Sequence, residues 1–312
     1  MDPAILIFGF GIGAMVGMTG MGGGTLMTPL LILIFGVKPI TAIGTDIFYA
    51  AVTKTVGGWR HLRMGTVNMG LSLWLAAGSV PAAVGGVWAI AILQSRIGEE
   101  RLDSLVYALL GGTLLMVGIV TLARALILSN LIEEREDFVL QRRHKVAAVV
   151  IGATTGFVIG ITSAGSGTVI AILLIAVYRL APRKVVGTDV FHAAILLWAA
   201  GIAHWVGGNV DFLLAGNILL GSIPGVIVGS HFAARAPTGF LRTALGVVLV
   251  ASGAMTVREG DATVWPIAAA VAGVGLALLI WFPRWWNERR RKREAAEGAV
   301  DRSSELAPES IG

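Results

Sequence analysis

Apolar stretches long enough to cross a lipid bilayer recur along the whole 312-residue chain. A helix needs roughly 20 residues to cross the hydrocarbon layer of about 30 Å. Hydrophobic residues make up 55% of the chain and charged residues 14%, which leaves too little polar surface to cover a soluble domain of this size. The short alternating segments of a membrane β-barrel are missing. The sequence therefore predicts an all-α membrane protein with several spans.

Four of the apolar segments are too short to span a membrane alone. They flank two glycine-rich stretches, residues 17–25 and 160–168, so each pair is predicted to be two half-length helices around a glycine break. The apolar segments lie at about 4–18, 25–36, 40–59, 67–94, 102–128, 146–161, 168–179, 184–206, 210–234, 239–257 and 262–283.

The two halves of the chain align at one constant offset of 143 positions, which pairs Thr19 with Thr162. Chance similarity of apolar composition would not also align rare polar residues and prolines, so the chain is predicted to contain a duplicated unit. The offset pairs Gly44-Thr45-Asp46 with Gly187-Thr188-Asp189, His61 with His204, Asn68 with Asp211, and Ser79-Val80-Pro81 with Ser222-Ile223-Pro224.

Basic residues in the loops predict that the two repeats have inverted topology. The loop at 179–184 has three basic residues, whereas its partner at 36–41 has only Lys38. The loop at 60–65 has two arginines, whereas its partner at 203–209 has no lysine or arginine. Because cytoplasmic loops are enriched in positive charge, this swap favours an odd number of crossings per repeat. Each repeat is then a broken-helix hairpin that re-enters on one side, followed by three spanning helices.

These features predict a multi-pass protein of the inner membrane with a cytoplasmic C-terminus. The basic residues sit at helix ends and in the run 289–293, which favours an orientation signal over nucleic-acid binding. The predicted parts are a first repeat at 1–128, a charged cytoplasmic linker at 129–145, a second repeat at 146–258, an additional transmembrane helix at 259–283, and a basic, then disordered, cytoplasmic tail at 284–312.

The glycine breaks are the predicted substrate site. Interrupted helices in inverted repeats bring helix ends and loose backbone groups together near the bilayer midplane, and glycine lets backbone N–H groups approach a ligand closely. The second half-helices begin at Thr25 and Thr168, where the positive end of the helix dipole favours an anion. The alternative is that the glycines only permit close helix packing. The predicted substrate-binding residues are Thr19, Gly20, Gly22, Gly23, Gly24, Thr25, Thr162, Ser163, Gly165, Ser166, Gly167, Thr168 and Lys54.

Asp46 and Asp189 lie about two turns inside their predicted spans, where an ionisable group is costly unless it is paired, hydrated or neutralised. They are predicted to carry protons, or to hydrogen-bond the opposing glycine break. The alternative is that each caps a helix that begins late. Lys54 lies deep in an apolar span and is a candidate countercharge, unless its side chain snorkels to the membrane surface.

Four further residues are assigned with the aspartates to proton coupling or gating: Thr45, Thr188, His61 and His204. Histidine titrates near neutral pH, although simple placement at the membrane interface also explains two histidines at span ends.

With these residues in view, the chain resembles the sulfite exporter TauE/SafE family of membrane transporters. The resemblance covers about residues 4–258. It implies a fold of about eight spans in two related halves and transport of sulfite, sulfonates such as sulfoacetate, or related small oxyanions. The extra C-terminal span departs from that pattern. The motifs that carry the resemblance are the two glycine breaks, the two Gly-Thr-Asp triplets, and the Ser-Val-Pro and Ser-Ile-Pro triplets.

The predicted function is a secondary transporter that exports a small sulfur-containing anion, coupled to protons, by alternating access around the two glycine breaks. An uncoupled anion channel is the alternative, and a retinal-type receptor using Lys54 is a remote third. The absence of a His/Glu metal signature, a Gly-x-Ser-x-Gly elbow and paired catalytic carboxylates argues against an enzyme. No cofactor or metal is expected. The expected partners are the anion, protons and membrane lipids, with a homodimer left open.

Overall fold

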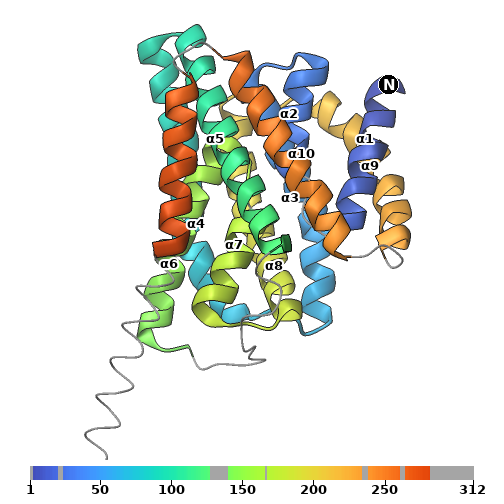
Figure 1. Cartoon of the computed structure of the whole chain (residues 1–312), viewed down its shortest axis with the longest axis vertical. Helices are drawn as coiled ribbons and strands as arrows, with labels where there is room; N and C mark the ends of the chain where they lie inside the picture. The colour runs from blue at the N-terminus through green and yellow to red at the C-terminus, as the bar shows by residue number, and fades with distance from the viewer. Residues whose placement is uncertain are drawn as a thin grey trace, which may run out of the picture.

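The computed structural model describes residues 3–19, 24–126, 140–165, 167–233, 238–260 and 264–281. These residues form an all-helical structure without strands (Figure 1). The tail at 284–312 and most of the linker at 129–145 lie outside the described residues, so their predicted character stays a prediction.

The observed helices follow the predicted apolar segments closely. Six of the described helices are long and apolar enough to cross a membrane, namely α4, α5, α6, α8, α9 and the unlabelled last helix, Val264–Trp281. The elements are α1 (Pro3–Thr19), α2 (Gly24–Phe35), α3 (Pro39–Arg63), α4 (Met69–Ile97), α5 (Glu99–Leu126), α6 (Arg142–Thr162), α7 (Thr168–Leu173), the π-helix η1 (Leu174–Tyr178), α8 (Pro182–Val206), α9 (Phe212–Ala233) and α10 (Thr238–Glu259).

Helices end at both predicted breaks. At the first, α1 ends at Thr19 and α2 begins at Gly24. At the second, α6 ends at Thr162 and α7 begins at Thr168. The chain turns there through Ser163, with φ of 59°, and Gly165, with φ of 94°. A positive φ strains a serine but not a glycine, so this turn is imposed by its surroundings and not by helix propensity alone.

Each of the main helix pairs combines one helix from before residue 127 with one helix from after residue 140. Helix α1 packs on α9, α4 on α6, α3 on α8, and α5 on α10. In Figure 1, α1 and α9 lie side by side at one edge of the molecule. Neither half therefore forms a separate bundle, and the two halves are interleaved.

Rows of glycine permit these close pairs. In α6, three glycines spaced four residues apart, Gly152, Gly156 and Gly160, face the backbone of α4. A side chain at Gly156 would collide with the carbonyl oxygen of Ser79. Helix α1 has the same spacing, at Gly9, Gly13 and Gly17, against α9. Because lipid supplies no hydrophobic force between helices, small residues that allow close backbone contact drive such packing. Of these glycines, Gly17 and Gly160 lie at the edges of the predicted breaks, and both permit close helix packing.

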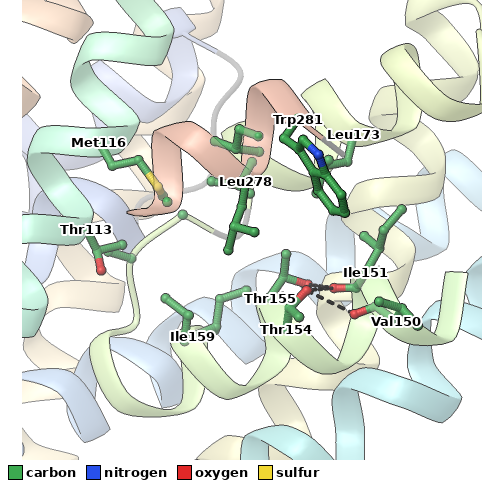
Figure 2. A pocket seen from close by; sticks show the side chains of 16 residues that line it. Thr113, Met116, Val150, Ile151, Thr154, Thr155, Ile159, Leu173, Leu278 and Trp281 are labelled. Atoms are coloured by element: carbon green, nitrogen blue, oxygen red, sulfur yellow. Dashed lines mark hydrogen bonds between the residues drawn. The ribbon is translucent and has the colours of Figure 1, made fainter. Parts of the chain in front are cut away.

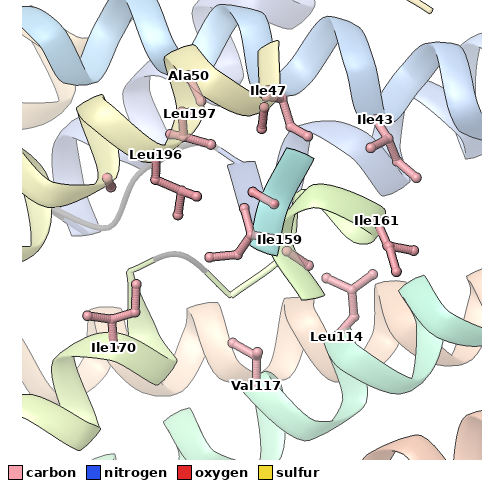
Figure 3. Close-up of a cluster of buried hydrophobic side chains, with 14 of the residues drawn as sticks. Ile43, Ile47, Ala50, Leu114, Val117, Ile159, Ile161, Ile170, Leu196 and Leu197 are labelled. Carbon is pink, nitrogen blue, oxygen red and sulfur yellow. The ribbon is translucent and has the colours of Figure 1, made fainter. Parts of the chain in front are cut away.

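The buried core surrounds the second break. Figure 3 shows apolar side chains from several helices converging there, among them Ile47, Leu114, Ile159, Ile170 and Leu197. Each of these side chains is at most 1% exposed. The outer surface is also apolar, with Val206 82% and Leu213 76% exposed. A protein that is apolar on both its inside and its outside is solvated by lipid.

We expect two glycines of the same helix, α4, to respond oppositely to alanine. Gly78→Ala should destabilise the protein by about 1–3 kcal/mol, because the new methyl group would collide with the carbonyl oxygen of Val149. Gly85→Ala should be neutral or stabilise by up to about 1 kcal/mol, because the position is open and alanine favours the helix. Thermal unfolding in detergent measures both. Equal effects would mean that α4 and α6 are not in close backbone contact.

Candidate functional site

Asp46 joins three elements at the centre of the molecule. Its side chain is fully buried in α3. Its Oδ2 atom accepts hydrogen bonds from Thr28 Oγ1 of α2 at 2.5 Å and from Ser163 Oγ of the second break at 2.8 Å. The capping alternative does not hold, since α3 begins at Pro39. The predicted hydrogen bond to the opposing glycine break is present, and its role in transport stays a prediction.

Lys54 is the buried cation of this region. It lies two turns after Asp46 on α3 and is only 6% exposed, which is incompatible with snorkelling to the membrane surface. Its charge acts on Asp46, on Asp189 of α8, and on His192 one turn further along α8. Both carboxyl groups therefore lie within the range of the charge of one lysine.

Asp189 has fewer hydrogen-bond donors around it, among the described residues, than Asp46, the residue with which it aligns. It is 5% exposed, and its Oδ1, like the Oδ1 of Asp46, has no hydrogen-bond partner among the described residues. The offset of 143 places Ala171 where Asp46 has Thr28, and Gly20 where it has Ser163. Neither residue has a side-chain hydroxyl to donate. The two aspartates thus occupy corresponding positions with different hydrogen bonding.

His192 and Ser79 form a second buried polar contact near Asp189. The Nε2 atom of His192 lies 2.8 Å from Ser79 Oγ of α4, and both residues are fully buried. His192 therefore bonds to Ser79 and not to Asp189. Sequence reasoning did not include Ser79, Thr28 or His192 among the site residues. Each is a polar residue inside an apolar segment, and Ser79 also belongs to the duplicated Ser-Val-Pro triplet.

The second break brings several predicted substrate-binding residues together. Thr162 Oγ1 donates to the carbonyl oxygen of Val158 at 2.8 Å and is therefore occupied within its own helix. Thr168 Oγ1 is buried without a hydrogen-bond partner in the described part of the chain. Ser163 is engaged with Asp46, and Gly165 and Gly167 complete the turn. Ser166 lies outside the described residues.

The first break is described only at its two ends. Thr19 closes α1, and Gly24 and Thr25 open α2. The predicted residues Gly20, Gly22 and Gly23 lie outside the described residues, so their assignment to the substrate site stays a prediction.

The Gly-Thr-Asp triplets fasten the two halves to each other. Thr45 Oγ1 accepts a hydrogen bond from the backbone N–H of Asp211, and Thr188 Oγ1 accepts one from the backbone N–H of Asn68, each at 3.0 Å. Asn68 and Asp211 also cap α4 and α9 through their side-chain oxygens. Thr45 and Thr188 therefore position the start of a helix in the opposite half.

The glycine of each triplet has a related task. A side chain at Gly44 would collide with the carbonyl oxygen of Asn209, and one at Gly187 would collide with Thr66. The glycine thus leaves room for the loop to which the following threonine hydrogen-bonds, while the aspartate side chain points to the centre of the molecule. This division of tasks explains why the three residue types occur together.

The two predicted histidines lie apart from the aspartates. His61 Nδ1 contacts Thr66 Oγ1 at 2.9 Å. His204 is fully buried, which does not fit simple placement at the interface, and its Nε2 donates to the carbonyl oxygen of Gly160 at 2.9 Å. This bond satisfies a carbonyl in the last turn of α6, just before the second break. Neither histidine hydrogen-bonds to Asp46 or Asp189.

The described residues contain no group of three or more histidine, aspartate or glutamate side chains that could hold a metal ion. The polar groups of the centre are instead carboxyl, hydroxyl, imidazole and ammonium groups. Such groups bind small ions and transfer protons.

Comparison with known proteins assigns the chain to a family. The family described as sulfite exporter TauE/SafE matches residues 5–256. The chain belongs to this TauE/SafE family. It is 36% identical over 253 residues to the probable membrane transporter protein YjnA of Bacillus subtilis, covering 81% of this chain and 98% of that protein. It is 30% identical over 241 residues to the probable membrane transporter protein YdhB of Bacillus subtilis, covering 77% of this chain and 94% of that protein. No solved structure matches significantly.

Membership confirms the resemblance inferred from the motifs. This TauE/SafE protein is a multi-pass membrane transporter and not an enzyme. The matched range covers α1 to α9 and most of α10, and the helix Val264–Trp281 follows it.

We expect Thr188→Val to destabilise the protein by about 1 kcal/mol or more, because it leaves the backbone N–H of Asn68 without its acceptor. Thr53→Val serves as the matched control, since the Thr53 hydroxyl only donates to carbonyls of its own helix. Thermal unfolding in detergent measures the difference. If both variants unfold at the wild-type temperature, Thr188 does not hold the two halves together.

Proposed function

We propose that this TauE/SafE protein is a secondary transporter that exports a small sulfur-containing anion, such as sulfite or an organosulfonate, coupled to protons. The observation that supports this most directly is the buried Lys54, whose charge acts on two buried carboxyl groups, one of which, Asp46, accepts a hydrogen bond from the second glycine break. An ionisable residue inside a membrane protein usually marks the path of an ion or proton.

The charges of this centre give a physical reason for proton coupling. With Lys54 and both aspartates ionised, the centre has a net negative charge and repels an anion. Protonation of one carboxyl group removes that charge and leaves Lys54 to attract the substrate. Binding of the anion and binding of the proton therefore strengthen each other, and the release of one weakens the binding of the other.

Asp46 and Asp189 have different roles in this proposal. Asp46 accepts two hydroxyl hydrogen bonds, which stabilise its ionised form and hold the second break against α2 and α3. Asp189 has no such donors among the described residues and carries the proton. Thr168, whose buried hydroxyl has no described partner, and the backbone of the second break bind the substrate from the side of α7.

Alternating access in this proposal arises from two inverted repeats, each with a re-entrant broken hairpin and three spans. The swap of basic loops between the halves supports the inversion. The cross-pairing of α1 with α9 and of α4 with α6 supports movement of each hairpin together with a helix of the other half. In this proposal the protein spans the inner membrane with its C-terminus in the cytoplasm.

Uptake of radiolabelled sulfite, sulfoacetate and sulfate into proteoliposomes, with and without a pH gradient, tests the function. We expect transport of at least one sulfur anion, with a rate that changes when the gradient is imposed. No flux of any of the three would reject the proposed substrate class. Flux that ignores the gradient would identify an uncoupled channel.

Asp189→Asn should reduce transport and flatten its pH dependence, because asparagine cannot exchange a proton. Asp46→Asn should instead lower thermal stability, since the carboxylate that accepts from Thr28 and Ser163 is lost. Any residual transport by this variant should keep the wild-type pH dependence. Wild-type pH behaviour in Asp189→Asn would remove the proton role from this residue.

Lys54→Gln should abolish or strongly reduce anion transport, because the centre then has no positive charge. Lys38→Gln is the matched control, since Lys38 is exposed and pairs with the exposed Glu99 at 3.3 Å. Transport by reconstituted Lys54→Gln at the wild-type rate would show that Lys54 is not the countercharge.

A further inference from the structure

A second, chemically different site lies beside the second break. A cavity of about 410 Å³ is enclosed by α5, α6, α7 and the helix Val264–Trp281. Figure 2 shows side chains from these elements around the space, with Met116 on one side and Trp281 on the other. Its volume lies within the range of about 300–1,000 Å³ that is typical of small-ligand sites.

The apolar lining of this cavity fits a hydrocarbon chain and does not fit the transported anion. Almost all of its lining side chains are apolar. The hydroxyls of Thr154 and Thr155 donate to backbone carbonyls of their own helix, at 2.9 and 2.6 Å to Val150 and Ile151 (Figure 2). An ion or a polar headgroup would lose its hydration there without gaining new partners.

The cavity opens to the lipid-facing surface of the protein. Leu278 and Trp281 line it and are also 53% and 56% exposed, and Val150 and Val158 of α6 are lining residues at the surface as well. In a transporter of the membrane, this surface contacts lipid. An acyl chain can therefore enter sideways from the bilayer.

A cluster of positive charge lies beyond one end of the cavity. Arg143 precedes Val150 by seven residues, so both lie on the same face of α6 about 10 Å apart. The Nε atom of Arg143 is buried and has no hydrogen-bond partner among the described residues. Arg142 is its neighbour in the sequence, and both residues lie in the first turn of α6. Trp281 marks the same end of the cavity, as tryptophan does at the headgroup level of membranes.

We infer that this cavity and the basic start of α6 form a binding site for an anionic phospholipid. One acyl chain fills the cavity, and the lipid phosphate binds Arg143 with support from the adjacent Arg142. The charge of these residues selects an anionic lipid over a zwitterionic one. The inference does not depend on which anion the protein transports.

The position of the site connects it to the transport machinery. Ala164 and Gly165 of the second break and Val169 of α7 line the cavity. The adjacent residue Ser163 donates to Asp46. A lipid chain in the cavity therefore packs against one side of the second break, while Asp46 contacts its other side. The chain stabilises the broken hairpin in this position.

Native mass spectrometry and thermal unfolding of the full-length protein in detergent test the inference. Dioleoylphosphatidylglycerol should bind more tightly than dioleoylphosphatidylcholine and raise the unfolding temperature more. Inorganic phosphate alone should do neither, because it cannot use the cavity. Equal binding of the two lipids, or equal stabilisation by phosphate, would overturn the inference.

Two variants separate the two parts of the site. Arg143→Gln should weaken phosphatidylglycerol binding about fivefold and leave phosphatidylcholine binding unchanged. Val158→Trp fills the cavity and should reduce the binding of both lipids. The controls are Arg101→Gln, at the exposed start of α5, and Val247→Trp, at an exposed position of α10 outside the lining.

Wild-type lipid binding by Val158→Trp would overturn the inference. A change in the oligomeric state of Val158→Trp without a change in its lipid binding would also overturn the inference, because the cavity would then belong to an interface between copies of the chain. Transport assays are not needed for any of these outcomes, so failure here is distinguishable from failure of the proposed transport function.

Discussion

Close backbone contact between helices of opposite halves is the constraint on which the rest of this structure depends. The glycine rows of α1 and α6 have no partner within their own half, and they meet α9 and α4 instead. In lipid, where burial of apolar surface gives no net gain, such contacts must come from tight van der Waals packing. The interleaving of the halves follows directly, and it brings the second break beside Asp46 of the first half.

The Gly-Thr-Asp triplets show how one short motif fulfils several physical requirements. Its glycine accepts a neighbouring backbone, its threonine satisfies a backbone N–H at the start of a helix, and its aspartate reaches the buried centre. In a membrane, an unsatisfied N–H costs several kcal/mol. The threonine therefore contributes to stability even though the sequence pattern pointed to transport.

Corresponding positions in the two halves have diverged at the centre. Asp46 accepts from Thr28 and Ser163, while the positions that correspond to those donors around Asp189 are Ala171 and Gly20. The histidines differ as well, since His204 bonds to Gly160 of α6 and His61 to Thr66 of the adjacent loop. A symmetrical scaffold thus surrounds an asymmetrical set of polar groups, and this allows the two aspartates to differ in function.

Local sequence features were enough to predict the helical class, the approximate helix bounds and the positions of both breaks, because the length of an apolar segment and the conformational freedom of glycine are local properties. It also identified Asp46, Asp189 and Lys54 as unusual, because a charge within an apolar segment is visible without a structure. The three-dimensional arrangement of the helices was needed to establish that Lys54 is buried, that Ser163 and Thr28 both donate to Asp46, and that Thr45 and Thr188 hold the halves together. These contacts join residues of different helices, up to 166 positions apart, and helix packing, which no local pattern encodes, determines which of them meet.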